Sequence, residues 1–549
     1  MGATRQEKFR LAAILSIVMF ALAAGGCEGD DGDDGNPGPA GTDGSDGINC
    51  WDLNGNGVGD LPEEDLNGDG VVDVLDCNAI ASGGGDLSDP AVFHKTYFSQ
   101  NEYTSTQSCL NCHGPIGDDV ITTGHWNWQG VAAGITGFEG DNHGKTDIVN
   151  NFCVAIATNE GRCSHCHIGY GYDDNTFDFG NTANVDCLIC HDKTGTYKKV
   201  PTEAGAPDPA VDLTAVAQSV GEGSGIPTRD NCIFCHSFAG GGNNVKHGDL
   251  AMEIANTTRE FDVHMGTDGG DMSCVQCHAV KKDSEKKVLS HGIGGMVFHS
   301  VDEGDMQDCV DCHGDRANIH AGKTVEPVLN ISAHDVLACQ VCHIPTFARD
   351  KTTKTEWYWA DAGDVERGVE KDDNGDPIYD PKKGTFVWAN NVRPSLLYYD
   401  GKWNKALVGA NEVFPETPAV LASPSADYTT AGAMIYPFKR MIGNQPFDAN
   451  NDTILVPHLF GTKGGENPYW GKYDWNLALQ DGANYTGQPY TGEFVFKDTV
   501  MYLTVNHEVA PAQQAYGMDG ACSDCHGADQ IDWTLLGYND DPVQGGVRP

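Results

Sequence analysis

The sequence predicts a mainly α-helical fold with extensive irregular coil and few strands, packed around large apolar groups that the peptide does not itself supply. Only 39% of the 549 residues are hydrophobic and 69 are glycine, a thin supply of core-forming side chains for so long a chain. Sixteen of the twenty cysteines fall in eight copies of Cys-x-x-Cys-His, where composition alone predicts about 0.03 copies. Short helices at these motifs, joined by long irregular connections, are the expected architecture.

The spacing of the motif is that of covalent haem attachment. Two thiols about one turn apart can form thioethers with the two vinyl groups of one porphyrin, and the next histidine then lies under the iron as its proximal ligand. Zinc is the rival metal for these cysteines. A zinc site would need four ligands from paired motifs and would not need a fixed trailing histidine. The predicted attachment cysteines, in chain order, are Cys109, Cys112, Cys163, Cys166, Cys187, Cys190, Cys232, Cys235, Cys274, Cys277, Cys309, Cys312, Cys339, Cys342, Cys522 and Cys525. The predicted proximal ligands are His113, His167, His191, His236, His278, His313, His343 and His526.

Twelve further histidines are available for the opposite, distal side of these irons. A second histidine ligand favours electron transfer over the binding of a substrate. The distal ligands that we expect are His94, His125, His247, His264, His299, His320, His334, His458 and His507, which leaves His143, His165 and His291 unassigned. Residues 344–521 contain no haem motif but are rich in aromatic side chains, as in "NPYWGKYDWNLAL". These rings either pack against haem faces or form a wall of a substrate cavity.

The N-terminus predicts export. Residues 1–27 consist of a basic segment, a short apolar run and the ending Ala-Gly-Gly-Cys27, which resembles a bacterial lipobox. Either Cys27 is lipidated or the signal peptide is cleaved in the ordinary way. Glu28 follows, which by resemblance to Gram-negative lipoproteins favours the outer membrane. We therefore expect an exported protein, either an outer-membrane lipoprotein or a cell-surface or periplasmic protein, that touches membrane only through a lipid anchor.

Residues 28–49 form a Gly/Asp-rich, collagen-like linker. Glycine recurs at every third position, but the segment is far too short to hold a triple helix, so a flexible acidic spacer is the alternative.

Residues 50–85 contain two calcium-loop patterns in tandem. Clustered hard oxygen atoms suit calcium, and a glycine in each loop allows the sharp turn between ligands. The predicted ligands are Asp52, Asn54, Asn56 and Glu63 in the first loop and Asp65, Asn67, Asp69 and Asp76 in the second. With no room for full helices, the segment resembles dockerin or thrombospondin type 3 modules. One or two Ca²⁺ ions are expected, with a Cys50–Cys77 disulfide closing the module; an acidic loop that binds nothing is the alternative.

The net negative charge of the chain argues against nucleic acid as a partner. With 34 basic and 79 acidic residues the net charge is −45, and both nucleic acids and anionic lipid surfaces attract basic patches. We expect no nucleic-acid partner.

Residues 86–549 form the predicted octahaem cytochrome domain. Several of its segments resemble a known family in residues beyond the Cys-x-x-Cys-His motifs themselves. "NNFCVAIATNEGRCSHCHIGYGYDDNTFDFGNTANVDCLICHDKTGTYKK" (150–199) resembles the second and third haem segments of the octahaem tetrathionate reductase family of c-type cytochromes. "VKHGDL", "DVHMGTDGG", "HIPTFAR" and "NHEVAPAQQAYG" also resemble that family. The likeness covers about residues 94–538. The calcium and glycine-rich segments are not part of the family's usual pattern.

The resemblance implies seven haems with two histidine ligands and one whose distal ligand is a lysine, which is the active site. We identify Lys246 as that ligand, on the second haem, with Lys145 as a rival and an exposed charge as the alternative. The unpaired Cys153 lies ten residues before Cys163 and could bind or attack a sulfur substrate, or be a buried inert thiol.

Two functions follow from these expectations. A reductase would pass electrons from redox partner cytochromes or quinol-linked donors to tetrathionate, nitrite or hydroxylamine. A cell-surface conduit, as a homo-oligomer or filament, would instead deliver electrons to an extracellular acceptor without substrate chemistry of its own. Adhesion through the calcium module would explain the tether but not eight haems.

Overall fold

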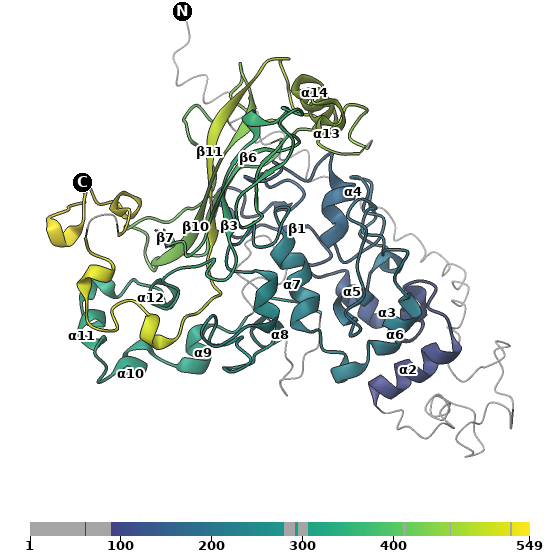
Figure 1. The fold of residues 1–549 in the computed structure, drawn as a ribbon, viewed down its shortest axis with the longest axis horizontal. Coiled ribbons are helices and arrows are strands. Elements are labelled where there is room, and N and C mark those ends of the chain that lie inside the picture. The colour runs from purple at the N-terminus through teal and green to yellow at the C-terminus, as the bar shows by residue number, and fades with distance from the viewer. Residues whose placement is uncertain are drawn as a thin grey trace, which may run out of the picture.

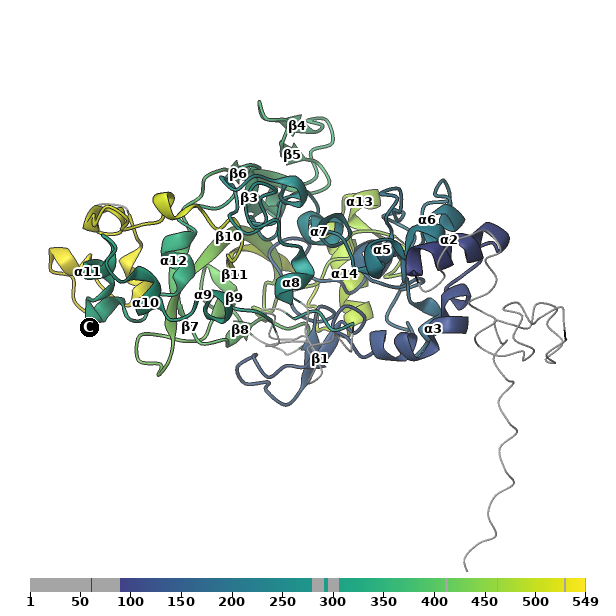
Figure 2. The same ribbon diagram turned by 90° about the horizontal axis from the view of Figure 1, so that it is seen from below.

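The computed structural model describes residues 89–278, 291–294, 306–409, 413–461, 463–527 and 530–548, together with Leu61. The predicted signal peptide, linker and calcium ligands lie outside the described residues, as does His299. The described chain is elongated, with the N-terminal helices α2 and α3 at one end and α10, α11 and the C-terminal segments at the other (Figures 1 and 2). A large sheet lies between them.

Most helices are short, and the Cys-x-x-Cys-His motifs lie in them or beside them. The helices are α2 (Pro90–Gln100), α3 (Gln107–Val120), α4 (Glu160–Cys163), α5 (Leu188–His191), α6 (Leu213–Ser219), α7 (Arg229–Phe238), α8 (Cys274–His278), α9 (Cys309–His313), α10 (Arg316–His320), α11 (Glu326–Leu329), α12 (Cys339–His343), α13 (Tyr469–Lys472) and α14 (Trp475–Thr486). Capping boxes start two motif helices: Thr228 with Asn231 begins α7, and Asp308 with Asp311 begins α9. Local polar side chains therefore fix where these motifs turn helical.

The expectation of a mainly α fold with few strands is wrong, because residues 353–504 build a nine-stranded sheet. Its strands are β3 (Thr353–Tyr358), β4 (Glu370–Lys371), β5 (Pro377–Asp380), β6 (Gly384–Ala389), β7 (Ser395–Tyr399), β8 (Trp403–Lys405), β9 (Ala419–Pro424), β10 (Met434–Asp448) and β11 (Phe494–Thr504). The order is β4-β5-β6-β3-β10-β11-β9-β8, and β7 also pairs with β10. A separate two-stranded sheet joins β1 (Gln129–Val131) to β2 (Asn142–Gly144).

The central strand β10 shows why the sheet was missed. Its sequence, "MIYPFKRMIGNQPFD", contains two prolines and a glycine, which normally indicate a loop. The register explains their presence. Pro437 pairs only with β7, before the pairing with β11 begins, and Pro446 pairs only with β11, after the pairing with β3 has ended. The further neighbours of the two prolines donate to the proline oxygens, Val505 N–H to Pro437 (3.1 Å) and Leu455 N–H to Pro446 (2.9 Å), and neither bond needs an N–H from proline.

The sheet buries an apolar cluster on each face. Along β11, Val500 and Tyr502 belong to one cluster, which packs against α12. Met501 and Leu503 belong to the other, which also contains Trp357 and the partly buried Cys153. Successive side chains of a strand point to opposite faces, so the alternation assigns the two clusters to the two sides of the sheet. The second cluster connects the sheet to the segment before the second haem motif.

Replacement of Gly443 should destabilise this sheet. A Cβ atom there would lie 2.4 Å from the Trp357 backbone oxygen of β3, so the two strands would have to separate. We expect Gly443→Ala to lower the free energy of unfolding of the holo-protein by about 1–3 kcal/mol. Gly140→Ala is the matched control, because a Cβ there meets nothing within 4 Å. Equal stability of the two variants in denaturant titrations would contradict this packing.

Candidate haem sites and reaction centre

Seven of the eight motif histidines face a second histidine ring. The separations of ring centres are 6.0 Å for His113–His94, 6.4 Å for His191–His291, 6.2 Å for His236–His125, 6.2 Å for His278–His507, 5.9 Å for His313–His264, 6.1 Å for His343–His320 and 6.4 Å for His526–His334. Imidazole nitrogen binds a transition metal at about 2 Å, and the ring centre lies about 1 Å behind the nitrogen. Two rings on opposite sides of one iron therefore have centres about 6 Å apart, which is the spacing found.

Most of these rings are also oriented by a hydrogen bond at the other nitrogen. Nδ1 donates to a backbone oxygen in His94 (2.7 Å), His191 (2.7 Å), His278 (2.7 Å), His320 (2.7 Å) and His334 (2.8 Å), and to a carboxylate in His291 (3.2 Å), His507 (3.3 Å) and His526 (2.8 Å). Such a bond fixes the tautomer that leaves the lone pair of Nε2 free for a metal. Burial acts in the same direction, since it lowers the pKa of His191 to about 4 and keeps the ring neutral. The residues present therefore fit haem iron.

Not every expected distal histidine joins a pair. The expected ligands that do are His94, His125, His264, His320, His334 and His507. His291 was left unassigned from sequence yet faces His191. His458 is fully buried, with Nδ1 3.3 Å from Asp481 and Nε2 2.9 Å from the Phe460 oxygen. Both of its nitrogens are already engaged, and within the described ranges neither it nor His247 faces a motif histidine.

The second motif is the exception among the eight. Its His167 is fully buried, with Nε2 2.9 Å from the Trp126 backbone oxygen, so that Nδ1 is the ring nitrogen without a hydrogen-bond partner. The nearest rings are those of Trp126 and Trp128, each centred 5.0 Å away. No second histidine faces His167 within the part of the chain that the structure describes. Lys145 stands above the Trp128 ring, with its Nζ 5.0 Å from the ring centre. The surroundings of this motif are therefore aromatic and cationic rather than imidazole-rich.

Comparison with known proteins agrees with this geometry. Residues 354–529 match the family model described as bacterial cytochrome c. A crystal structure of an octahaem cytochrome c from Shewanella oneidensis is similar over 82% of this chain and 98% of its own, with 37% identity and a TM-score of 0.69. The chain belongs to the multihaem c-type cytochromes. The cytochrome is also 24% identical over 257 residues to a protein of uncharacterised function from Archaeoglobus fulgidus, covering 37% of this chain and 84% of that protein.

Cysteines of different motifs lie against each other along the cytochrome. With the motifs numbered in chain order, thiol contacts join motif 1 to 3, 2 to 4, 4 to 5 and 6 to 7, through Cys109–Cys187, Cys166–Cys235, Cys232–Cys274 and Cys309–Cys339. Electrostatic interactions between thiols connect motif 3 to 4, 5 to 6 and 7 to 8. Because thioethers attach at the porphyrin edge, haems held by these cysteines would follow one another in a line from motif 1 to motif 8. Motif 2 is a side branch that joins the line at motif 4.

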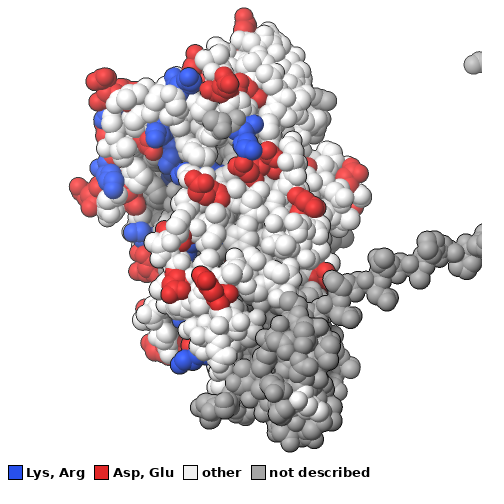
Figure 3. Space-filling model, turned by 90° about the vertical axis from the view of Figure 1, so that its right-hand side faces the viewer, with Lys and Arg blue, Asp and Glu red and all other residues white. Residues whose placement is uncertain are grey.

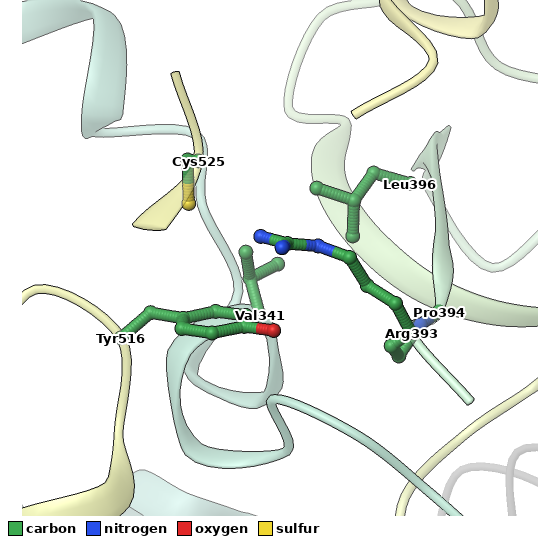
Figure 4. A pocket seen from close by; sticks show the side chains of 6 residues that line it. All are labelled: Val341, Arg393, Pro394, Leu396, Tyr516 and Cys525. Carbon is green, nitrogen blue, oxygen red and sulfur yellow. The ribbon is translucent and has the colours of Figure 1, made fainter. Parts of the chain in front are cut away.

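The last motif is held in place by an arginine. Arg393 donates hydrogen bonds to the Asp524 oxygen and to Gln530, and its guanidinium lies 4.6 Å from the centre of the Tyr516 ring. Figure 4 shows this side chain reaching from the segment before β7 toward Cys525, over a small cavity that Val341 helps to line. The end of the line is thereby fixed to the sheet and to α12.

Lys246 lies close to the second motif. The thiol of Cys166 and the ammonium of Lys145 both act electrostatically on its amine. Burial and the neighbouring Lys145 lower the pKa of Lys246 to about 8, which increases the fraction of neutral amine, the form that can bind a metal. The glycine-rich turn before it is required by packing: Gly240 has φ +82°, and a Cβ there would lie 3.1 Å from Phe152.

Cys153 lies beside the same motif, where its thiol interacts electrostatically with that of Cys163. Its backbone N–H donates to Asn150 Oδ1 (3.1 Å), and its side chain packs in the apolar cluster with Trp357. Burial raises the pKa of Cys153 even though the nearby cations Lys383, Lys354 and Arg162 oppose the shift. The thiol is therefore protonated at neutral pH and a poor nucleophile until something displaces its apolar surroundings.

Lys354 is a residue near this centre that sequence reasoning missed. Its Nζ lies 3.5 Å from the centre of the Phe386 ring and 4.0 Å from that of Trp357, and its side chain is buried. Burial and the neighbouring Lys383 hold the pKa of Lys354 well below its ordinary value, although the Cys153 thiol opposes the shift. The only signal in the sequence was its position within "KTEWYW", where aromatic rings can surround a cation.

A distal histidine should control the spin state of a single haem. We expect His320→Ala to convert one haem equivalent of the ferric cytochrome from low spin to high spin, because His343 would lose the ring that faces it across 6.1 Å. Electron paramagnetic resonance of the holo-protein measures this change. His458→Gln is the control and should leave the spin-state distribution unchanged. An unchanged spectrum for His320→Ala would contradict the pairing.

Proposed function

We propose that this cytochrome is a terminal reductase of a small oxidised substrate, with tetrathionate, nitrite and hydroxylamine as the substrates to test. It would carry eight haem c groups, seven of them with two histidine ligands. Electrons would run along the line of motifs and leave at the second haem, held by Cys163, Cys166 and His167, with Lys246 as its distal ligand. Redox partner cytochromes or quinol-linked donors would supply the electrons.

The observation that carries this proposal is the contrast between His167 and the other motif histidines. Seven rings are matched by a second imidazole, which leaves an iron without a free position. Around the second motif the described side chains offer Lys246 and Lys145 instead. An amine that is partly protonated near neutral pH is more easily displaced by an incoming anion than imidazole is. The branch that ends at motif 2 is thus the place where the line of haems can meet a substrate.

When bound, the haem supplies single electrons and one coordination position, and the side chains of the chain do the rest. The reduction of nitrite or hydroxylamine needs a proton donor. The free amine of Lys246, with its pKa lowered to about 8, would serve as that donor. Lys145 adds positive charge that stabilises an anion beside the Trp128 ring. Cys153 keeps a protonated thiol in the neighbouring apolar cluster and would contact a sulfur substrate rather than attack it.

The N-terminal predictions belong to this proposal. Export, lipidation of Cys27 and a calcium module with one or two Ca²⁺ ions would hold the reductase at the outer membrane or cell surface, with residues 28–49 as the linker. None of the helices in the described ranges is both long and apolar enough to cross a membrane.

A conduit without substrate chemistry is the second candidate, and the unbroken line of motif contacts favours it equally. In that case the cytochrome, alone or as a filament, would pass electrons to an extracellular acceptor. The two candidates differ at the second haem, because a conduit has no need of an exchangeable ligand there.

The test is to replace the two lysines separately. We expect Lys246→Gln to change the ligand field of one haem in near-infrared magnetic circular dichroism and to abolish tetrathionate, nitrite or hydroxylamine reduction by a reduced viologen dye. Lys145→Gln is the matched control, which should leave every ligand field intact while lowering turnover. A new ligand field only in Lys145→Gln would assign the ligand to Lys145 instead. Eight identical haems and no turnover in the unaltered protein would establish the conduit.

A further inference from the structure

A cavity of about 500 Å³ opens on the surface close to the second motif. It is formed by the end of α4, the turn between β5 and β6, and the segment that leads into α13. Its lining includes Arg162, Lys382, Lys383, Asp380, Phe460 and Trp470. Figure 3 shows Lys and Arg side chains gathered around a hollow in the upper part of one face of the molecule.

The cavity leads inward to the proposed reaction centre. Arg162 directly precedes Cys163, the first attachment cysteine of the second haem. The positive charges of Arg162 and Lys383 both act on the Cys153 thiol, so two residues of the cavity wall lie within electrostatic reach of it. Trp470 packs on the same apolar cluster as Cys153. The inner wall of the cavity therefore adjoins the Cys153–Cys163 region.

The cations of the cavity are only partly neutralised. Arg162 lies over the rings of Trp470 (5.1 Å) and Phe460 (5.6 Å), and within the described ranges it forms no ion pair. Lys383 is 3.5 Å from Asp380, the one carboxylate on the lining, and Lys382 is exposed. Three cations facing one carboxylate leave a positive cavity on a chain whose net charge is −45. A low-dielectric concave wall concentrates such a field on a small anion.

We propose that this cavity is a vestibule that collects a small oxyanion and passes it to the second haem. The inference rests on the proposed function and narrows the substrate class of the reductase to anions. The positive cavity attracts tetrathionate and nitrite, whereas hydroxylamine, which is uncharged at neutral pH, is not attracted by its charge. The aromatic rings of Phe460 and Trp470 hold the guanidinium of Arg162 toward the cavity, so that charge is presented without a competing carboxylate.

Alkylation of Cys153 tests the vestibule without relying on turnover. In the holo-protein the sixteen motif cysteines would be thioethers. Among the described cysteines, Cys153 would then carry the one free thiol. Iodoacetate and iodoacetamide differ only in charge, and the ratio of their rates at Cys153 cancels any change in thiol ionisation. We expect the double variant Lys382→Gln/Lys383→Gln to lower the iodoacetate-to-iodoacetamide rate ratio by about tenfold. Arg162 is left in place because it adjoins an attachment cysteine.

Lys402→Gln is the control for this experiment. Lys402 is exposed and precedes β8, at the opposite edge of the sheet from β4 and β5, and its replacement should leave the ratio unchanged. A ratio that does not fall in the double variant, or no labelling of Cys153 by either reagent, overturns the vestibule. Steady-state kinetics separate the two proposals: if the ratio falls but no substrate is turned over, the vestibule stands and the reductase fails. If turnover occurs, the double variant should raise KM for tetrathionate and leave that for hydroxylamine unchanged.

Discussion

A pair of imidazoles that face each other across about 6 Å is the interaction on which this cytochrome depends. Each pair joins two segments that are separate in sequence, as His278 of α8 is joined to His507 beyond β11. Neither ring can approach the other to pack, because the space between them is that of a metal ion and its porphyrin. With haem between the rings, each pair would stabilise the fold, so we expect folding and haem attachment to be coupled.

The nine-stranded sheet supplies an apolar core of side chains in addition to the haem sites. Clusters on its two faces fix α12, the helix of motif 7, on one side and the segment around Cys153, beside motif 2, on the other, so the sheet connects the line of motifs to its side branch. The aromatic stretches of residues 344–521 serve mainly this packing: Trp357 stacks on Trp359 with ring centres 5.1 Å apart, and Tyr469 on Trp475 at 3.9 Å. Among the aromatic residues of 344–521, Phe460 and Trp470 line the cavity near the second motif. The structure thus shows these aromatic residues packing against one another, and their contact with haem faces or with a substrate stays a prediction.

The sequence is informative where the chemistry of haem attachment dictates the spacing of residues. It is uninformative where contacts between distant segments decide the structure. Residue type and number picked out the motif histidines and six of the histidines that the structure places opposite them, and their role as iron ligands stays a prediction. His291 could not be chosen over His458 because each is a single imidazole in an irregular segment, and only the fold shows that His458 has both nitrogens engaged. The sheet was hidden by Pro437 and Pro446, whose tolerance depends on where neighbouring strands begin and end. Nothing in the sequence distinguished Lys382 and Lys383 from other surface lysines, and only the approach of α4 and α13 makes them part of a cavity.

Anomalous diffraction from crystals of the holo-cytochrome at the iron absorption edge tests the central claim most directly. The account predicts one iron midway between the rings of each facing pair, for example between His113 and His94, and one further iron beside His167 with an amine on its open side. Iron peaks displaced from the midpoints, or an imidazole opposite His167, would contradict it.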